Sequence, residues 1–211
     1  MIETNRRKFL TAAALGAGAL VAPRALTSSA ARAAAFAPVA SGPTAPLFAR
    51  AEAELARHRA GITHDDVVGL ADFSPASRAA RLHLVDLQRR QVTSYLVAHG
   101  RGSDPSHTGF LQRFSNDPGS NCTSEGAYRT ADYYEGAHGH SMRIEGLEAT
   151  NSNALSRAIV VHGAWYVSED MIRQHGMLGR SEGCFAVAES DLPAVLSTLG
   201  PGRLLVAGKF A

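Results

Sequence analysis

The chain has 211 residues, a formal net charge of +2, 45% hydrophobic residues and 7% aromatic residues. These values are typical of a globular protein with one ordinary domain and some extra segments. The first 33 residues hold five basic groups and one acidic group, and the rest of the chain has 16 basic and 18 acidic groups. The body therefore has a net charge of −2 and lacks the basic stripe of a nucleic-acid-binding protein, so we expect no nucleic-acid partner.

The N-terminal 33 residues have the layout of a secretory signal peptide. Basic residues at 6–8 precede an apolar run of 13 residues, 10–22, which is shorter than the roughly 20 residues of a spanning helix. Ala-Arg-Ala at 31–33 fits a cleavage site, and Arg-Arg-Lys-Phe-Leu at 6–10 resembles a twin-arginine signal. We therefore expect export to a periplasm or cell-wall space, a mature chain that starts near Ala34, and no stable membrane insertion after cleavage. The alternative is an uncleaved anchor or a plain basic tail.

The next segment changes from a linker to a helix. Residues 34–46 are rich in Ala, Pro, Gly and Ser, which predicts a linker. The spacing of apolar residues over 47–58 predicts a short helix that ends near Gly61 and packs on the main domain.

The remaining chain is dominated by strand patterns. Residues 81–87 and 91–100 predict a β-hairpin around a polar turn. Residues 101–128 are long, polar and rich in turn residues, as functional or disordered loops are. Further strands are predicted at 141–150, 157–163 and 203–210.

Two short helices interrupt these strands. Ser168 is a good N-cap for a helix that ends near Gly176, and Ser190 is the expected N-cap of a helix over 191–199. About six strands with few helices predict a mainly β domain.

The two cysteines, Cys122 and Cys184, allow several interpretations. In an oxidising compartment they would ordinarily form one disulfide. A thiol is instead a nucleophile where a base or a positive group promotes its ionisation. His162 ends the most hydrophobic strand, and Cys184 follows 22 residues later in a turn with Ser181 and Gly183. Backbone N–H groups of that turn can converge on an acyl oxygen, although a core histidine and a structural thiol would give the same pattern.

A resemblance to a known family favours the catalytic interpretation. The stretches AIVVHGAWYVSED and HGMLGRSEGC resemble the signature of the peptidoglycan L,D-transpeptidases, and residues 73–210 are similar to murein L,D-transpeptidase catalytic domain proteins of the YkuD type. The resemblance implies a mainly β sandwich or barrel with a few short helices. The expected domains are a signal peptide at 1–33, a linker and helical segment at 34–72, and a catalytic domain at 73–211.

The resemblance also assigns roles to residues of the motif. Cys184 matches the nucleophile, His162 the base, and Gly163 the residue whose carbonyl orients the imidazole. Gly183 and Cys184 match the oxyanion-hole amides, and Ser181 matches the serine of the motif.

Two positions depart from the family pattern. Glu182 stands where most members have histidine, and Ala186 stands where most have arginine. The second departure leaves open which residue holds a substrate carboxylate, and the candidates are Arg180, Arg143 and Arg157.

Other residues near the motif are weaker candidates. His138 and Tyr134 are expected to line the substrate cleft, with a loop histidine and a hydrophobic plug as the alternatives. Nine scattered histidines do not supply a set of zinc ligands, so we expect no metal and no organic cofactor. Cys122 is expected to be a free, incidental thiol, although a reversible disulfide could protect Cys184.

The resemblance implies acyl transfer on peptidoglycan stem peptides by a monomeric enzyme. The Cys184 thiolate would attack the carbonyl of the L-centre of a diamino acid and expel the terminal D-alanine. Transfer to an amine makes a cross-link, and transfer to water makes the enzyme an L,D-carboxypeptidase. The alternatives are a thiol hydrolase of another peptide bond and a non-catalytic wall-binding module with a Cys122–Cys184 disulfide.

Overall fold

The computed structural model describes residues 44–210, so the expected signal peptide and most of the expected linker lie outside the described residues. The described part forms one nine-stranded sheet in the order β3-β2-β1-β9-β5-β6-β7-β8-β4. The strands are β1 (Val67–Asp72), β2 (Leu82–Asp86), β3 (Gln91–Tyr95), β4 (Val97–Ala98), β5 (Gly126–Gly136), β6 (Gly139–Gly146), β7 (Val160–Gly163), β8 (Phe185–Val187) and β9 (Leu204–Gly208). The α-helices are α1 (Ala45–His58), α2 (Glu169–His175) and α3 (Leu192–Leu199). The expected mainly β fold with a few short helices is confirmed.

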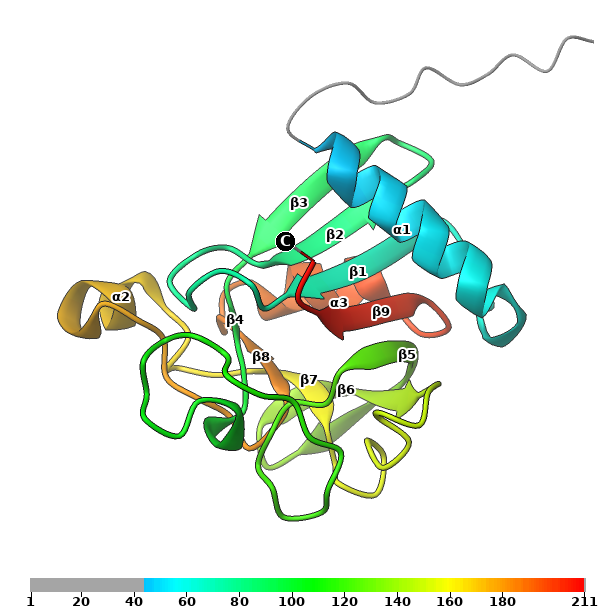
Figure 1. Ribbon diagram of the computed structural model, residues 1–211. Helices are drawn as coiled ribbons and strands as arrows, with labels where there is room; N and C mark the ends of the chain where they lie inside the picture. Colours follow the sequence, from blue (N-terminus) through cyan, green and yellow to red (C-terminus); the bar gives the residue numbers. More distant parts are fainter. Residues whose placement is uncertain (1–43, 211) are drawn as a thin grey trace, which may run out of the picture. The chain divides into compact units, whose positions relative to one another are not determined.

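The sheet curls until its two edges almost meet. Its outermost strands, β3 and β4, are separated in the chain by Leu96 alone, so one continuous stretch belongs to both edges. Figure 1 shows the result: β1, β2 and β3 lie beneath α1, and β5, β6, β7 and β8 form the opposite part. Such closure is the geometry expected of a sandwich or barrel.

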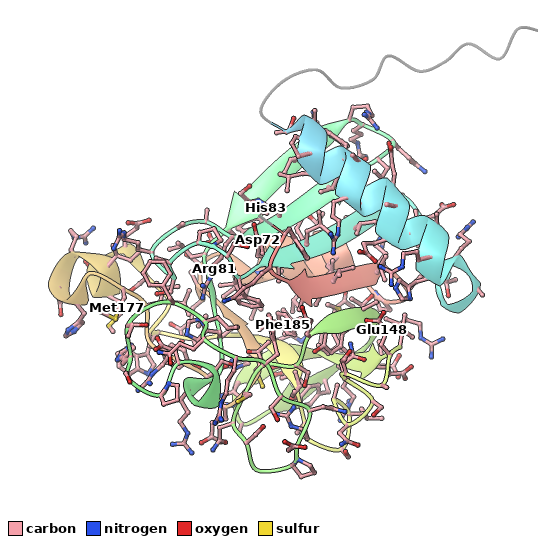
Figure 2. The ribbon with its side chains drawn as sticks, viewed as in Figure 1. Asp72, Arg81, His83, Glu148, Met177 and Phe185 are labelled. Atoms are coloured by element: carbon pink, nitrogen blue, oxygen red, sulfur yellow. The ribbon has the colours of Figure 1, made fainter. Side chains whose placement is uncertain are left out.

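The interior of the curled sheet is filled by aromatic and aliphatic side chains. The ring centroid of Phe185 in β8 lies 5.5 Å from that of Tyr128 in β5, in an edge-to-face contact, and 6.2 Å from that of Phe73. All three rings are fully buried, and Figure 2 places Phe185 between the two parts of the sheet. A second cluster, which includes Phe48 and Ala51 of α1, joins that helix to the sheet. Burial of each large apolar side chain contributes about 1.5–3 kcal/mol.

Most of the predicted elements are present, and the differences have local causes. The β2–β3 hairpin, β6, β7, β9, α1 and α2 are confirmed. The Ser168 hydroxyl caps α2 by accepting a hydrogen bond from the Met171 amide, and Gly176 ends the helix in the left-handed region. The prediction for α3 was wrong by one residue, since its N-cap is Asp191, without a side-chain cap, rather than Ser190. Three strands were not predicted: β1, β5 and β8.

No helix within residues 44–210 is long and apolar enough to cross a bilayer.

Candidate active site

The imidazole of His162 is held in one orientation on β7. The ring is 1% exposed, and its Nδ1 lies 2.9 Å from the carbonyl oxygen of Gly163. A carbonyl can only accept, so Nδ1 carries the proton and Nε2 keeps a free lone pair. Gly163 thus has the place that the resemblance implied, and His162 is set up as a neutral base.

The parallel pairing of β7 with β8 brings Cys184 to the same face as His162. Val161 pairs with Phe185 and His162 with Ala186, so one step back along the register sets Cys184 beside Val160. Side chains alternate between the faces of a strand. Because Phe185 points into the core, Cys184 and His162 share the opposite face.

The thiol does not yet contact the base. Cys184 Sγ lies 3.5 Å from the carbonyl oxygen of Ala158, to which the thiol donates. Among the described residues, no hydrogen bond joins Cys184 to His162. Catalytic hydrogen bonds are often loose before substrate binds and tighten in the complex.

Both groups are held in their neutral forms. Burial raises the pKa of the Cys184 thiol, although the nearby Val160 amide lowers it, and the charge of Glu182 raises it further. Burial lowers the pKa of His162, although the hydrogen bond to Gly163 raises it. The resting site therefore contains a thiol and an imidazole rather than a thiolate–imidazolium pair.

The Ser181 hydroxyl shapes the turn that presents the sulfur. Its Oγ donates to the Cys184 carbonyl at 2.7 Å and accepts from the Gly183 amide at 3.2 Å. Gly183 has φ +124°, and a Cβ there would lie 2.8 Å from the carbonyl oxygen of Cys122, so only glycine fits. Since Ser181 occupies the Gly183 amide, the structure does not leave both predicted oxyanion-hole donors free.

A buried cluster of ionisable side chains contacts the turn at residues 181–184. Arg81, His99 and Asp104 are each at most 1% exposed. Arg81 Nη2 lies 2.7 Å from His99 Nδ1, and His99 Nε2 lies 3.5 Å from an Asp104 carboxylate oxygen. The His99 carbonyl in turn accepts the Ser181 amide at 2.9 Å.

The charges in this cluster follow from its contacts. Burial lowers the pKa of Arg81 to about 9, which leaves it charged near neutral pH. Burial and the charge of Arg81 lower the pKa of His99 to about 3, so its ring is neutral. Burial raises the pKa of Asp104, but hydrogen bonds from Thr108 and Gly109 lower it below its usual value.

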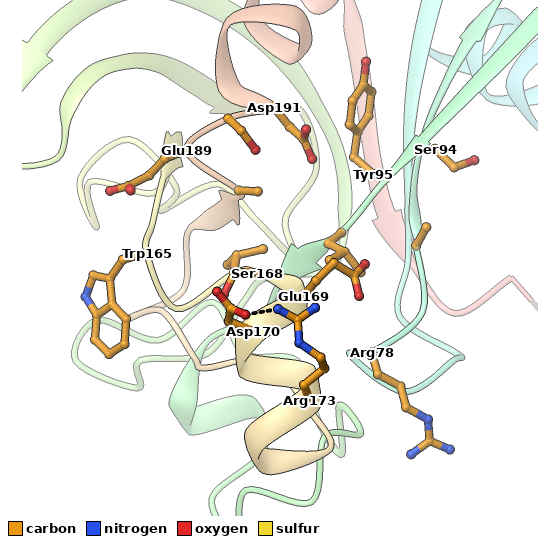
Figure 3. A pocket seen from close by; sticks show the side chains of 15 residues that line it. Arg78, Ser94, Tyr95, Trp165, Ser168, Glu169, Asp170, Arg173, Glu189 and Asp191 are labelled. Atoms are coloured by element: carbon orange, nitrogen blue, oxygen red, sulfur yellow. Dashed lines mark hydrogen bonds and ion pairs between the residues drawn. The ribbon is translucent and has the colours of Figure 1, made fainter.

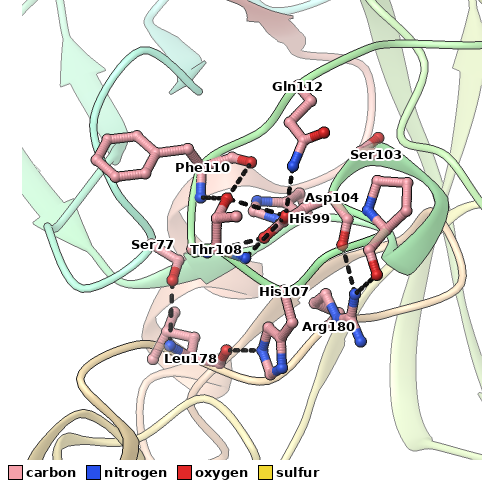
Figure 4. A network of polar contacts seen from close by, with 12 residues as sticks. Ser77, His99, Ser103, Asp104, His107, Thr108, Phe110, Gln112, Leu178 and Arg180 are labelled. Atoms are coloured by element: carbon pink, nitrogen blue, oxygen red, sulfur yellow. Dashed lines mark hydrogen bonds and ion pairs between the residues drawn. The ribbon is translucent and has the colours of Figure 1, made fainter.

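Arg180 belongs to the same supporting structure. Its guanidinium donates to the backbone carbonyls of Asp104 and Pro105 (Figure 4). His107 likewise contacts the Leu178 carbonyl at 3.0 Å. These contacts join the segment before Cys184 to the loop after β4, so the Arg180 guanidinium is already engaged by backbone carbonyls.

Arg157 stands on the other side of the turn. Its guanidinium donates to the carbonyls of Ser115 and Cys122, at 2.8 and 2.5 Å, and to the hydroxyls of Ser124 and Ser120, at 2.7 and 3.2 Å. Burial raises the pKa of Cys184, and the positive charge of Arg157 offsets part of that rise. A cavity of about 340 Å³ adjoins it, lined by Pro118, Gly119, Asn121, Ser156, Arg157 and Glu182. The third candidate, Arg143, is stacked 4.1 Å over the ring of Tyr134. Arg157 is thus the predicted arginine that borders both the thiol and a cavity.

Both cysteines are free in the structure. Cys122 is fully buried, and its thiol donates to the Ser120 carbonyl at 3.6 Å. No group of His, Cys, Asp or Glu within residues 44–210 could hold a metal ion.

Tyr166 was not among the predicted site residues. Burial, together with the charges of Cys184 and Glu182, raises the pKa of this phenol to about 12. The hydroxyl therefore stays protonated near neutral pH. An aromatic residue four positions after a strand-end histidine is the available signal in the sequence, and it is a weak one.

A second, larger groove begins next to Tyr166. Trp165 packs edge to face on that ring at 5.8 Å, yet remains 71% exposed. The groove encloses about 700 Å³ and carries acidic and basic groups around Trp165 (Figure 3). Its charged lining residues are Arg78, Glu169, Asp170, Arg173, Glu189 and Asp191.

We predict that iodoacetamide labels Cys184 before Cys122. Cys122 is fully buried, whereas Cys184 is partly exposed. Because burial raises the pKa of Cys184, its labelling rate should keep rising from about pH 6 to pH 9. Peptide mapping by mass spectrometry at timed intervals measures both rates. A Cys122→Ser control should keep the Cys184 rate, and faster labelling of Cys122 would contradict the assignment.

Comparison with known proteins identifies the family of the chain. A family model described as the L,D-transpeptidase catalytic domain matches residues 44–207. No curated protein matches the chain. Among solved structures, an L,D-transpeptidase from Mycobacterium smegmatis is similar, with 12% identity, a TM-score of 0.42, and coverage of 68% of this chain and 58% of that one.

Two further structures are similar at the same level. The helical cell shape determining protein Pgp2 from Campylobacter jejuni has 10% identity and a TM-score of 0.45, over 77% of this chain and 56% of that one. An L,D-transpeptidase from Xylanimonas cellulosilytica has 14% identity and a TM-score of 0.40, over 79% and 70%. The chain spans less than two thirds of the length of the Mycobacterium and Campylobacter structures. Because the family model covers most of the chain, the protein belongs to the L,D-transpeptidase catalytic domain family.

Proposed function

We propose that the protein is a peptidoglycan L,D-transpeptidase with Cys184 as its nucleophile and His162 as its base. The observation that carries this proposal is the pair itself: a histidine whose Nδ1 is fixed by the Gly163 carbonyl, and a cysteine on the same face of the neighbouring parallel strand. The membership of the chain in the transpeptidase family supplies the substrate class.

The first half-reaction forms a thioester. Nε2 of His162 takes the thiol proton, and the sulfur attacks the carbonyl of the L-centre of the stem peptide's diamino acid. The tetrahedral intermediate collapses, the C–N bond to D-alanine breaks, and the imidazolium returns the proton to the leaving amine. Since the resting thiol is protonated, this transfer must accompany substrate binding.

The second half-reaction decides the type of enzyme. An acceptor amine attacks the thioester, His162 takes its proton, and the thiol is regenerated as a new amide forms. Water in place of the amine gives a shortened stem peptide, the product of an L,D-carboxypeptidase.

One donor is available for transition-state stabilisation besides the Gly183 amide. The amide of Cys184 lies close to its own sulfur and lowers the pKa of the thiol, against the larger effect of burial. An amide in this place can donate to an oxyanion. We propose that the positive charge of Arg157, at the edge of its cavity, attracts the terminal carboxylate of D-alanine through the electric field rather than through free N–H donors.

Incubation with purified disaccharide tetrapeptides tests the proposal. Mass spectrometry should detect free D-alanine together with either a cross-linked dimer or a tripeptide product. A folded Cys184→Ala protein is the matched control and should release none. If the wild-type protein is folded and neither product forms, the proposed reaction is wrong. Thiol titration of the unreduced protein separates the enzyme from a wall-binding module, since a Cys122–Cys184 disulfide would leave no thiols.

We also propose export through a twin-arginine signal, which the pattern at 6–10 supports. Replacement of both arginines, Arg6 and Arg7, by lysine should retain the protein in the cytoplasm, as measured by cell fractionation. Normal export of that variant would contradict the proposal.

A further inference from the structure

The tip of the β5–β6 hairpin lies over the base. β6 pairs with β7 through Met142–Val161 and Arg143–Val160, and the antiparallel register then carries the tip past the end of β7. There the ring of His138 lies on the ring of His162, with centroids 4.2 Å apart and planes 19° apart. Two histidines that are distant in sequence are thus stacked face to face.

The hairpin is braced in this position. The Tyr133 hydroxyl donates to the Leu196 carbonyl at 2.9 Å, and His140 pairs with Glu135 at 2.8 Å. A register shift between Thr130 and Tyr133 redirects the strand before the tip. Within the described residues His138 makes no hydrogen bond. The recorded contact of its ring is the stack on His162.

The stack restrains the base in a way that the backbone contact cannot. The hydrogen bond from Nδ1 to Gly163 fixes one atom of the ring, and a flat neighbour restrains the ring plane. A face contact leaves the Nε2 edge open for proton transfer. We propose that His138 is a positioning residue that holds the plane of the His162 imidazole through this ring contact.

The stack also has an electrostatic effect on His162, and few other groups contribute to it. A protonated His138 repels a proton on His162 and lowers its pKa, in addition to the effect of burial. From other elements, Cys184 shares the face of the base, and Glu189 packs against Gly163. Glu135, His140 and Arg143 are the other charged groups of the hairpin near its tip. The role rests on the proposed function only in treating His162 as the base.

Two variants separate the stack from the charge. His138→Phe keeps a flat ring but removes the charge, whereas His138→Ala removes both. Both should raise the pKa of His162, because the repelling charge is gone, and this pKa is measured by NMR titration of the ring. For D-alanine release at the pH optimum, we expect kcat to fall about tenfold in His138→Ala and less than about twofold in His138→Phe.

The pH profile gives a further readout that loss of stability would not produce. In both variants the acid limb of kcat should move to higher pH, since the base becomes protonated earlier. His175→Phe is the matched control, because this exposed histidine at the C-terminal end of α2 lies outside the hairpin and should leave the His162 titration unchanged.

An unchanged His162 titration in His138→Ala would overturn the proposal, as would an equal shift in His175→Phe. A shifted titration in a protein that releases no D-alanine would support the stack and contradict the proposed function instead. His138 is exposed at a hairpin tip, so these variants should fold normally.

Discussion

Cys184→Ser should abolish D-alanine release while the protein keeps its fold. Serine has nearly the same shape, but its hydroxyl is a far weaker acid than a thiol, so His162 cannot activate it comparably. His162→Ala removes the base and leaves the thiol protonated, since burial already raises the pKa of Cys184. We expect each change to lower kcat on the order of 10³-fold or more.

The double variant provides the stronger test of a joint mechanism. Residues that act as one unit are not additive, so Cys184→Ser with His162→Ala should be little slower than either single variant. Cys122→Ser should keep full activity, because Cys122 contacts the Ser120 carbonyl rather than the base. Full activity in a folded Cys184→Ser protein would rule out the proposed mechanism, and thermal melting verifies the fold.

Arg81→Met should be the most damaging substitution for stability. Arg81 is fully buried, donates to the carbonyls of Pro75 and Val97 and to His99, and lies over the ring of Phe73. Its loss leaves the Val97 and Pro75 carbonyls and the His99 ring without their donor and removes the charge that faces Asp72 and Asp104. Removing one partner from a buried ionic group typically costs about 3–5 kcal/mol.

Urea unfolding measures this loss against a surface control. Arg78→Met replaces an exposed arginine three positions earlier and should change the free energy of unfolding by less than about 0.5 kcal/mol. Arg81→Lys keeps the charge without the forked donor geometry, so it should fall between the two. Equal midpoints for Arg81→Met and Arg78→Met would show that the buried cluster adds nothing to stability.

The sequence was sufficient to identify the candidate pair, His162 and Cys184, and the elements with strong local signals. His162 and Cys184 lie in a recognisable motif, and α2 has both a capping serine and a C-terminal glycine. The β2–β3 hairpin has two β-branched, apolar runs around a polar turn. These features depend on neighbouring residues, so a local pattern describes them.

Other features depend on contacts that no local pattern describes. β8 has only three residues, and β5 mixes tyrosines with charged residues because one of its faces is exposed near the tip. The cluster of Arg81, His99 and Asp104 joins three segments that meet only when the sheet curls. The stack of His138 on His162 similarly depends on a hairpin register and a bulge. The neutral resting thiol follows from burial, which sequence spacing does not reveal.

The continuity of β3 and β4 also bears on association between molecules. Open sheet edges can pair with other chains and seed aggregation. Here one edge, β4, is two residues long and fully buried, and the other, β3, has exposed polar side chains at Gln91, Thr93 and Ser94. Leu96 joins these two strands, so residues 91–98 form both edges of the sheet. Neither edge offers a neighbouring molecule a long, exposed apolar strand for pairing.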